Sequence, residues 1–69
     1  MLVHITLDKV KPNDQIVIEN LGFGIVEQIL GDPYFIGCPI KFKKYYDNQK
    51  QQHFKNKVVA VIDEKVYLL

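Results

Sequence analysis

The sequence predicts an all-β domain: a small, five- to six-stranded antiparallel sheet that curls into a partly open barrel. Apolar residues mostly recur with a period of two, and turn-forming residues interrupt them at short intervals. The chain has 69 residues, 48% of them hydrophobic, which is enough for one core. A sheet of so many short strands buries one face only if it curls on itself. We therefore expect residues 1–69 to form a single small β-barrel domain.

The first two strands are predicted on either side of a proline-containing turn. Alternation of apolar and polar residues predicts a strand over 2–7. The sequence Lys-Pro-Asn-Asp over 11–14 then predicts a turn, because proline fixes φ and Asn and Asp bond to the nearby backbone. A strand over 15–19 follows, in which Ile16 and Ile18 share one face.

The next strand contains a glycine where the sheet can bend. Asn-Leu-Gly over 20–22 predicts a reversal, and the apolar residues of 23–30 predict a strand. Gly24 lies inside that strand, and its missing side chain permits a bulge or a sharp bend. Gly-Asp-Pro-Tyr over 31–34 predicts another turn.

The strand that follows places lysines on the solvent face. Residues 35–46 alternate so that Ile40 and Phe42 share the inner face while Lys41 and Lys43 point outward.

We expect a long loop and then a hairpin at the end of the chain. Residues 47–57 lack apolar periodicity and predict a loop, with room for one helical turn that starts at Asp47. Residues 58–62 and 65–69, separated by a turn at 63–64, predict a hairpin. A second arrangement is also open: a flat antiparallel sheet completed by dimerisation or covered by a short helix from 47–57.

Charge is distributed unevenly along the chain. Residues 41–57 contain six lysines and one acid, a balance of +5, whereas the other residues contain three lysines and seven acids, a balance of −4. Aromatic side chains and a histidine interleave with the lysines, as in surfaces that bind polyanions or acidic proteins. The candidate partner-binding residues are Lys41, Lys43, Lys44, Tyr45, Tyr46, Lys50, His53, Lys55 and Lys57. Because Tyr45 and Tyr46 are adjacent on a strand, only one of them can face the partner while the other packs inward.

Three short segments carry a resemblance to Src-homology-3-like (SH3-like) small barrels. They are VKPNDQIVI at 10–18, FGIVEQI at 23–29 and IKF at 40–42. The order of a Pro-Gly-Asp turn, an apolar strand, a glycine and two further strands is similar to tudor-like and KOW-like domains, with Asn13 in place of the usual glycine. It also resembles the barrel subunits of photosynthetic electron transfer, such as the small barrel of photosystem I and the variable subunit of ferredoxin-thioredoxin reductase.

The resemblance implies a binding role, with partners that differ between the two branches. Tudor-like and KOW-like modules contact RNA polymerase, ribosomes, nucleic acid or acidic peptides. The photosynthetic subunits present a basic surface to an acidic ferredoxin. Fold alone does not decide between these partners.

Catalytic and metal-binding chemistry is not predicted. The chain has two histidines and one cysteine, fewer ligands than a zinc site needs, and it contains no phosphate-binding glycine loop or nucleophile motif. We therefore expect no enzyme activity, no metal and no cofactor. The lone Cys38 cannot form an internal disulfide, and no segment is typical of a signal peptide or membrane span, so we expect a cytoplasmic protein that does not bind membranes.

The leading hypothesis is a non-catalytic module that docks on an acidic protein through the lysine- and tyrosine-rich strand and the segment after it. The alternative is a nucleic-acid-binding barrel of weak sequence specificity, because the chain has no arginine for bidentate reading of guanine. A third hypothesis is self-assembly through an unpaired barrel edge, which would make the protein a homo-oligomer.

Overall fold

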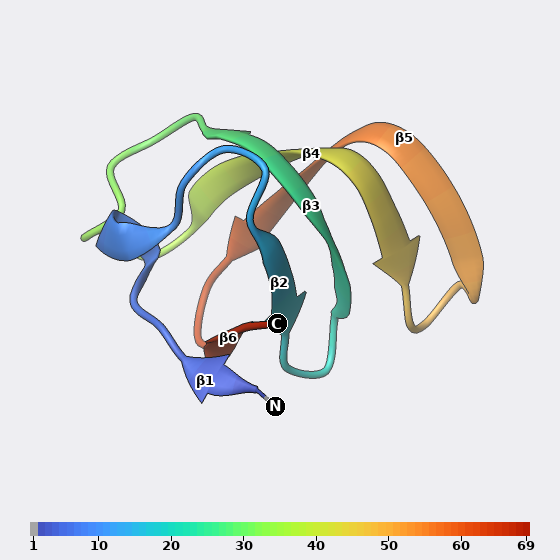
Figure 1. Cartoon of the computed structure of the whole chain (residues 1–69), viewed down its shortest axis with the longest axis horizontal. Coiled ribbons are helices and arrows are strands. Elements are labelled where there is room, and N and C mark those ends of the chain that lie inside the picture. Colours follow the sequence, from blue (N-terminus) through green and yellow to red (C-terminus); the bar gives the residue numbers. More distant parts are fainter. Residues whose placement is uncertain (1) are drawn as a thin grey trace.

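Six antiparallel strands form one open sheet in the computed structural model, which describes residues 2–69 (Figure 1). The strands, with one short 3-10 helix, are β1 (Val3–His4), η1 (Leu7–Lys9), β2 (Gln15–Ile18), β3 (Gly22–Ile29), β4 (Cys38–Asp47), β5 (Gln52–Val61) and β6 (Val66–Leu68). Their order in the sheet is β1-β6-β2-β3-β4-β5. The predicted all-β class is therefore confirmed.

The last strand lies inside the sheet and corrects the predicted terminal hairpin. β6 pairs with β2 and β1, through the partners Val17 and Tyr67 on one side and His4 and Tyr67 on the other, and it does not pair with β5. A turn does form after β5, where the carboxylate of Glu64 accepts hydrogen bonds from the backbone N–H of Ile62 and Asp63. That turn carries the chain across to the other end of the sheet instead of folding it back.

The predicted long loop over 47–57 is also wrong, because most of it is strand. A single turn spans 48–51, and β5 begins at Gln52. The Asp47 carboxylate accepts from the N–H of Gln49 and Lys50, and its carbonyl accepts from the N–H of Gln51. These bonds make the one helical turn that was expected to start at Asp47.

Two further strands are shorter than predicted. The strand expected over 2–7 is limited to Val3–His4, because the chain turns into η1. The strand expected from residue 35 begins at Cys38, because Phe35 donates a backbone bond to Asp32 in a turn. The strands expected over 15–19 and 23–30 are confirmed, with small differences at their ends.

The core lies on the inner face of the curled sheet. Alternate residues of β2 and β4 are fully buried there, as the period of two predicted for Ile16, Ile18, Ile40 and Phe42. Val26 of β3 joins them.

A paired irregularity in β3 and β4 shifts which side chains face the core. The register changes between Ile25 and Val26 and again between Val26 and Gln28, not at Gly24. Lys43 has no partner in either neighbouring strand, so Phe42 and Tyr45 both face inward although they are three residues apart. Bulges of this kind bend a strand and increase its twist. The irregularity therefore helps the sheet to curl.

Asn13 lies in the turn that precedes β2. Its φ is +74°, in the left-handed region that asparagine tolerates better than most residues. The turn is fastened by the backbone N–H of Lys11, which donates to the Asp14 carboxylate. Asn13 thus supplies the left-handed backbone conformation of this turn.

No helix in residues 2–69 is long and apolar enough to cross a membrane.

Candidate docking surface

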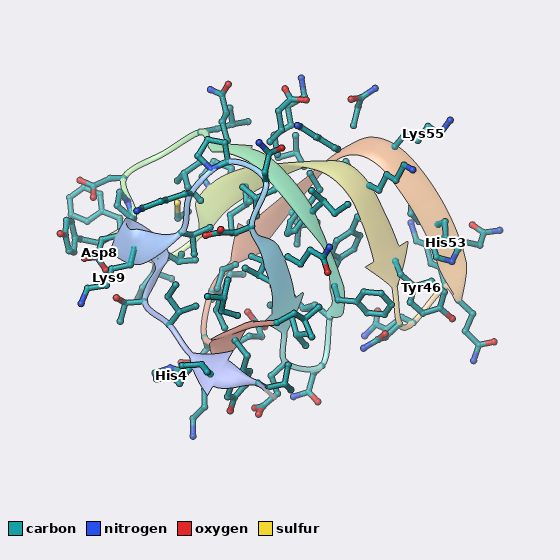
Figure 2. All side chains as sticks on the ribbon, in the orientation of Figure 1. His4, Asp8, Lys9, Tyr46, His53 and Lys55 are labelled. Carbon is teal, nitrogen blue, oxygen red and sulfur yellow. The ribbon has the colours of Figure 1, made fainter. Side chains whose placement is uncertain are left out.

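The predicted binding residues divide between the two faces of the β4–β5 hairpin. Residues that are direct partners in an antiparallel pair point to the same face of the sheet. The outer face carries Lys41, Lys44, Tyr46, His53 and Lys55, whereas the inner side carries Tyr45 and Lys57, with Lys50 reaching toward it from the turn. Figure 2 shows Tyr46, His53 and Lys55 together at one end of the molecule.

Three aromatic side chains form a row across the outer face, which we call the aromatic row: Phe23 on β3, Tyr46 on β4 and His53 on β5. Phe23 is the direct partner of Tyr46, and Tyr46 of His53. Their ring centroids are 5.3 Å and 4.8 Å apart. Such cross-strand aromatic pairs stabilise a sheet, and here Phe23 and His53 are exposed while Tyr46 is half-buried.

The line of side chains continues across the remaining strands of the sheet, β2, β6 and β1. Val17 is the partner of Phe23, and Tyr67 is the partner of Val17. His4 completes the line beside Tyr67, with ring centroids 5.7 Å apart. A histidine therefore stands at each end of one line of side chains.

Two lysines that form no ion pair within residues 2–69 lie along one side of the aromatic row. Lys44 and Lys55 are direct partners on β4 and β5, and both are exposed. Within residues 2–69 the structure contains one ion pair, between Lys41 and Glu27 at 3.2 Å, so neither of these two lysines is neutralised by a carboxylate.

The two lysines predicted to point outward from the strand over 35–46 are already engaged within the fold. Lys41 pairs with Glu27, and Lys43 donates to the side-chain oxygen of Asn13. Sequence alternation placed Lys41 and Lys43 on solvent but could not show these contacts. The free charge of the surface thus centres on Lys44 and Lys55.

A cavity of about 270 Å³ opens beside the aromatic row. Its lining includes the predicted binding residues Lys44 and His53. Most of the lining, however, consists of residues that were not predicted from the sequence: Gln15, Phe23, Gly24, Ile25 and Leu69. The signal for Phe23 and Ile25 was their place on the same face of a predicted strand, but the partner strands were not known. The cavity offers a mostly apolar site with cationic and titratable groups at its margin.

The inner side of the hairpin is occupied by contacts within the chain. Lys57 lies over the ring of Phe54, with Nζ 4.8 Å from the ring centroid, and Lys50 lies 5.6 Å from it. Tyr45 is only 3% exposed and packs on Phe42, with ring centroids 4.8 Å apart. Burial, followed by the nearby charges of Asp47 and Glu64, raises the pKa of Tyr45 to about 12. The buried ring of Tyr45 is therefore not part of the docking surface, although Tyr45 is among the residues that line the 270 Å³ cavity.

A second surface, at residues 31–37, was missed by sequence reasoning, which expected a turn and then a strand. We call this segment the apolar loop. Tyr34, Phe35 and Ile36 are 76%, 70% and 83% exposed, and they line a cavity of about 410 Å³ together with parts of η1 and the 61–66 segment. The signal was present as three consecutive large apolar residues between Pro33 and Gly37.

The apolar loop is held in a defined shape. The Asp32 carboxylate accepts from the N–H of Tyr34, and the Asp32 carbonyl accepts from the N–H of Phe35. Gly37, with φ of +85°, donates its N–H to the carbonyl of Val61. The Tyr34 hydroxyl reaches the Asp8 carboxylate at 3.4 Å.

The described part of the chain contains no group of three or more His, Cys, Asp or Glu side chains that could hold a metal ion. Cys38 is free and buried at the start of β4, where it acts as a small apolar side chain beside the core.

Comparison with known proteins gives no match: no family model, no curated protein and no solved structure matches this chain.

Proposed function

We propose that this chain is a non-catalytic binding module, an SH3-like barrel that docks on an acidic protein through the outer face of β3, β4 and β5. The observation that carries the proposal is the aromatic row lying beside two exposed lysines, Lys44 and Lys55, that have no acidic partner in residues 2–69. The crossover of β6 to the far side of β2 supports the barrel, because it lets the meander β2–β5 curl over one core.

The arrangement has the anatomy of a protein-protein interface. Such interfaces are rich in aromatic residues at their centre and carry charge at their rim. Here Phe23 and Tyr46 form the centre, while Lys44 and Lys55 lie to one side. The 270 Å³ cavity would receive an apolar anchor side chain of the partner, and the lysines would pair with acids next to that anchor.

Single-stranded nucleic acid is the second candidate, favoured by the combination of aromatic rings and lysines on one sheet face. The rings, however, pack closely against one another, at centroid distances of 5.3 Å and 4.8 Å. No base could enter between neighbouring rings at these distances, so stacking would be limited to their outward surfaces. This limit, and the absence of arginine, favour a protein partner.

The test is binding of two labelled probes, measured by fluorescence anisotropy at 50 and 200 mM salt. One probe is a peptide with a central phenylalanine between aspartates and glutamates, and the other is an oligothymidylate. We expect the peptide to bind, and Lys44→Glu with Lys55→Glu to weaken it at least about tenfold, or 1.4 kcal/mol. Higher salt should also weaken it, because these charges are exposed.

The matched control changes the same charge elsewhere. Lys9→Glu with Lys11→Glu alters two exposed lysines away from the aromatic row and should leave peptide affinity nearly unchanged. Equal loss in both double variants would show that only net charge matters and would contradict a site at Lys44 and Lys55. Absence of peptide binding at 50 mM salt would reject the acidic-protein proposal, and binding of the oligothymidylate alone would replace it with nucleic acid.

A further inference from the structure

We propose that the partner is a second copy of this chain, whose apolar loop, with the acids near it, docks on the aromatic row and on Lys44 and Lys55. This inference rests on the proposed function, because it uses the same outer face of β3, β4 and β5. It adds the identity of the partner that binds there. The supporting observation is that the chain itself carries an exposed apolar segment that lines a cavity together with the acids Asp8 and Glu64, which is the chemistry that face would recognise.

The apolar loop has the properties of an anchor. Phe35 and Ile36 are 70% and 83% exposed, although side chains of this kind are normally buried. Hydrogen bonds to Asp32 and Val61 hold the loop before any partner arrives. A loop that is already ordered loses little conformational entropy on binding, which favours affinity.

Acids outnumber lysines in and next to the segments that line the cavity of the apolar loop. Asp8, Asp32, Asp63 and Glu64 lie on or next to the segments that form the 410 Å³ cavity, against two lysines in the same segments, Lys9 and Lys65, so four acids minus two lysines leaves a balance of −2. The Thr6 side chain holds the pKa of Asp8 below its usual value, and the backbone N–H of Ile62 does the same for Glu64. These two carboxylates thus keep their charge in mildly acidic solution. Their sign complements that of Lys44 and Lys55.

The two surfaces lie at opposite ends of the molecule. Figure 2 shows Asp8 at one end and Tyr46, His53 and Lys55 at the other. One copy can therefore use both surfaces at once, which makes the contact head-to-tail and produces an open chain of copies or a closed ring. The exposed area is 4715 Å², so two interfaces of roughly 800 Å² each would cover about a third of it.

The experiment is sedimentation of the full chain and two variants over a range of concentrations. The face variant is Lys44→Glu with Lys55→Glu, and the loop variant is Phe35→Ser with Ile36→Ser. We expect the mean mass of the unchanged chain to rise beyond that of a dimer as concentration increases, and to fall in high salt. Each variant alone should stay monomeric, with association weakened at least about tenfold.

Mixing the two variants distinguishes this contact from a symmetric one. The face variant keeps an intact loop, and the loop variant keeps an intact face, so an equal mixture should form a dimer that grows no further. A monomer at every concentration, a mass that levels at dimer for the unchanged chain, or a mixture that stays monomeric would each overturn the inference.

Two additions keep the test decisive. Asp63→Lys alters an exposed acid without touching the core and serves as a second loop variant, which should also weaken association, if Phe35→Ser with Ile36→Ser fails to fold. The acidic peptide separates the two proposals. If the chain binds the peptide but stays monomeric, self-assembly is rejected and the proposed docking face is retained. If the chain neither binds the peptide nor associates, both proposals are rejected.

Discussion

Lys44 on β4 and Lys55 on β5 are direct cross-strand partners, so two like charges face each other on the outer face of the sheet. Side chains in such a pair have Cβ atoms about 5 Å apart, and like charges in this position destabilise a sheet. No carboxylate in residues 2–69 forms an ion pair with either of them. The arrangement therefore lowers the stability of the hairpin while concentrating positive charge beside Tyr46 and His53.

Replacing one of these lysines by an acid should stabilise the fold. Lys55→Glu converts the repulsion into an attraction, and we expect the free energy of unfolding to rise by about 0.5–1 kcal/mol in urea denaturation. Lys55→Gln, which only removes the repulsion, should give about half that gain. A Glu variant less stable than the Gln variant would show that the two charges do not interact in the folded chain.

Gly24→Ala should destabilise the sheet strongly. A Cβ at this position would lie 2.2 Å from the carbonyl oxygen of Lys44 and 2.9 Å from a ring carbon of Phe42, so β3 and β4 would have to separate. We expect a loss of about 3 kcal/mol in the free energy of unfolding. The control is Gly37→Asn, where an added Cβ would have no atom within 4 Å apart from those of the adjoining residues, and the φ of +85° is one that asparagine tolerates; we expect a change below about 1 kcal/mol.

Asn56→Val should weaken β5 although valine favours strands. Asn56 has a φ of +55° and, like Lys43 opposite it, is skipped in the pairing of β4 with β5. A β-branched side chain in this left-handed conformation costs about 1–2 kcal/mol, which thermal unfolding would detect. Asn56→Gly should be close to neutral. A valine variant as stable as the unchanged chain would mean that the strand can pair regularly at this position.

Stability should fall in alkaline solution because of Tyr45. Its pKa in the folded chain is about 12, above the ordinary value of 10.0, so the folded state holds the proton more tightly than the unfolded state. The stabilisation is fully present below pH 10 and is lost as pH rises toward 12. Tyr45→Phe should lose less stability across this window, as followed by circular dichroism in urea. Tyr34→Phe, at an exposed position, should follow the unchanged chain, and an identical profile for Tyr45→Phe would contradict the assignment.

Strands that alternate clearly were predictable from the sequence. Ile16 and Ile18, and Ile40 and Phe42, are each separated by one residue and face the core as expected. The fold class followed from these patterns. Pairing partners did not follow, because the apolar residues of 58–62 are compatible with several neighbours, and the turn at Glu64 directs the chain to β2 rather than back to β5.

The prediction of a loop over 47–57 was wrong for a different physical reason. β5 is an edge strand, and near its start it carries exposed polar side chains on the outer face, such as His53, and a half-buried one on the inner face, Phe54. A strand of this kind has no hydrophobic period to detect. The docking surface could be predicted only in part. Its lysines can be counted in the sequence, but the contacts that neutralise Lys41 and engage Lys43 come from Glu27 and Asn13 in distant segments.

The position of β6 between β1 and β2 has a consequence for the time course of folding. The meander β2–β5 is built from pairs of strands that follow one another in the sequence, whereas β1 has no partner in the sheet until residues 66–68 have paired with β2. Contacts between such distant segments form slowly. A single proteolytic cut within 62–65 would leave the meander intact, separate β6 from it and leave β1 joined to the chain without a partner strand, so an early intermediate of folding and a late product of digestion should share the paired meander.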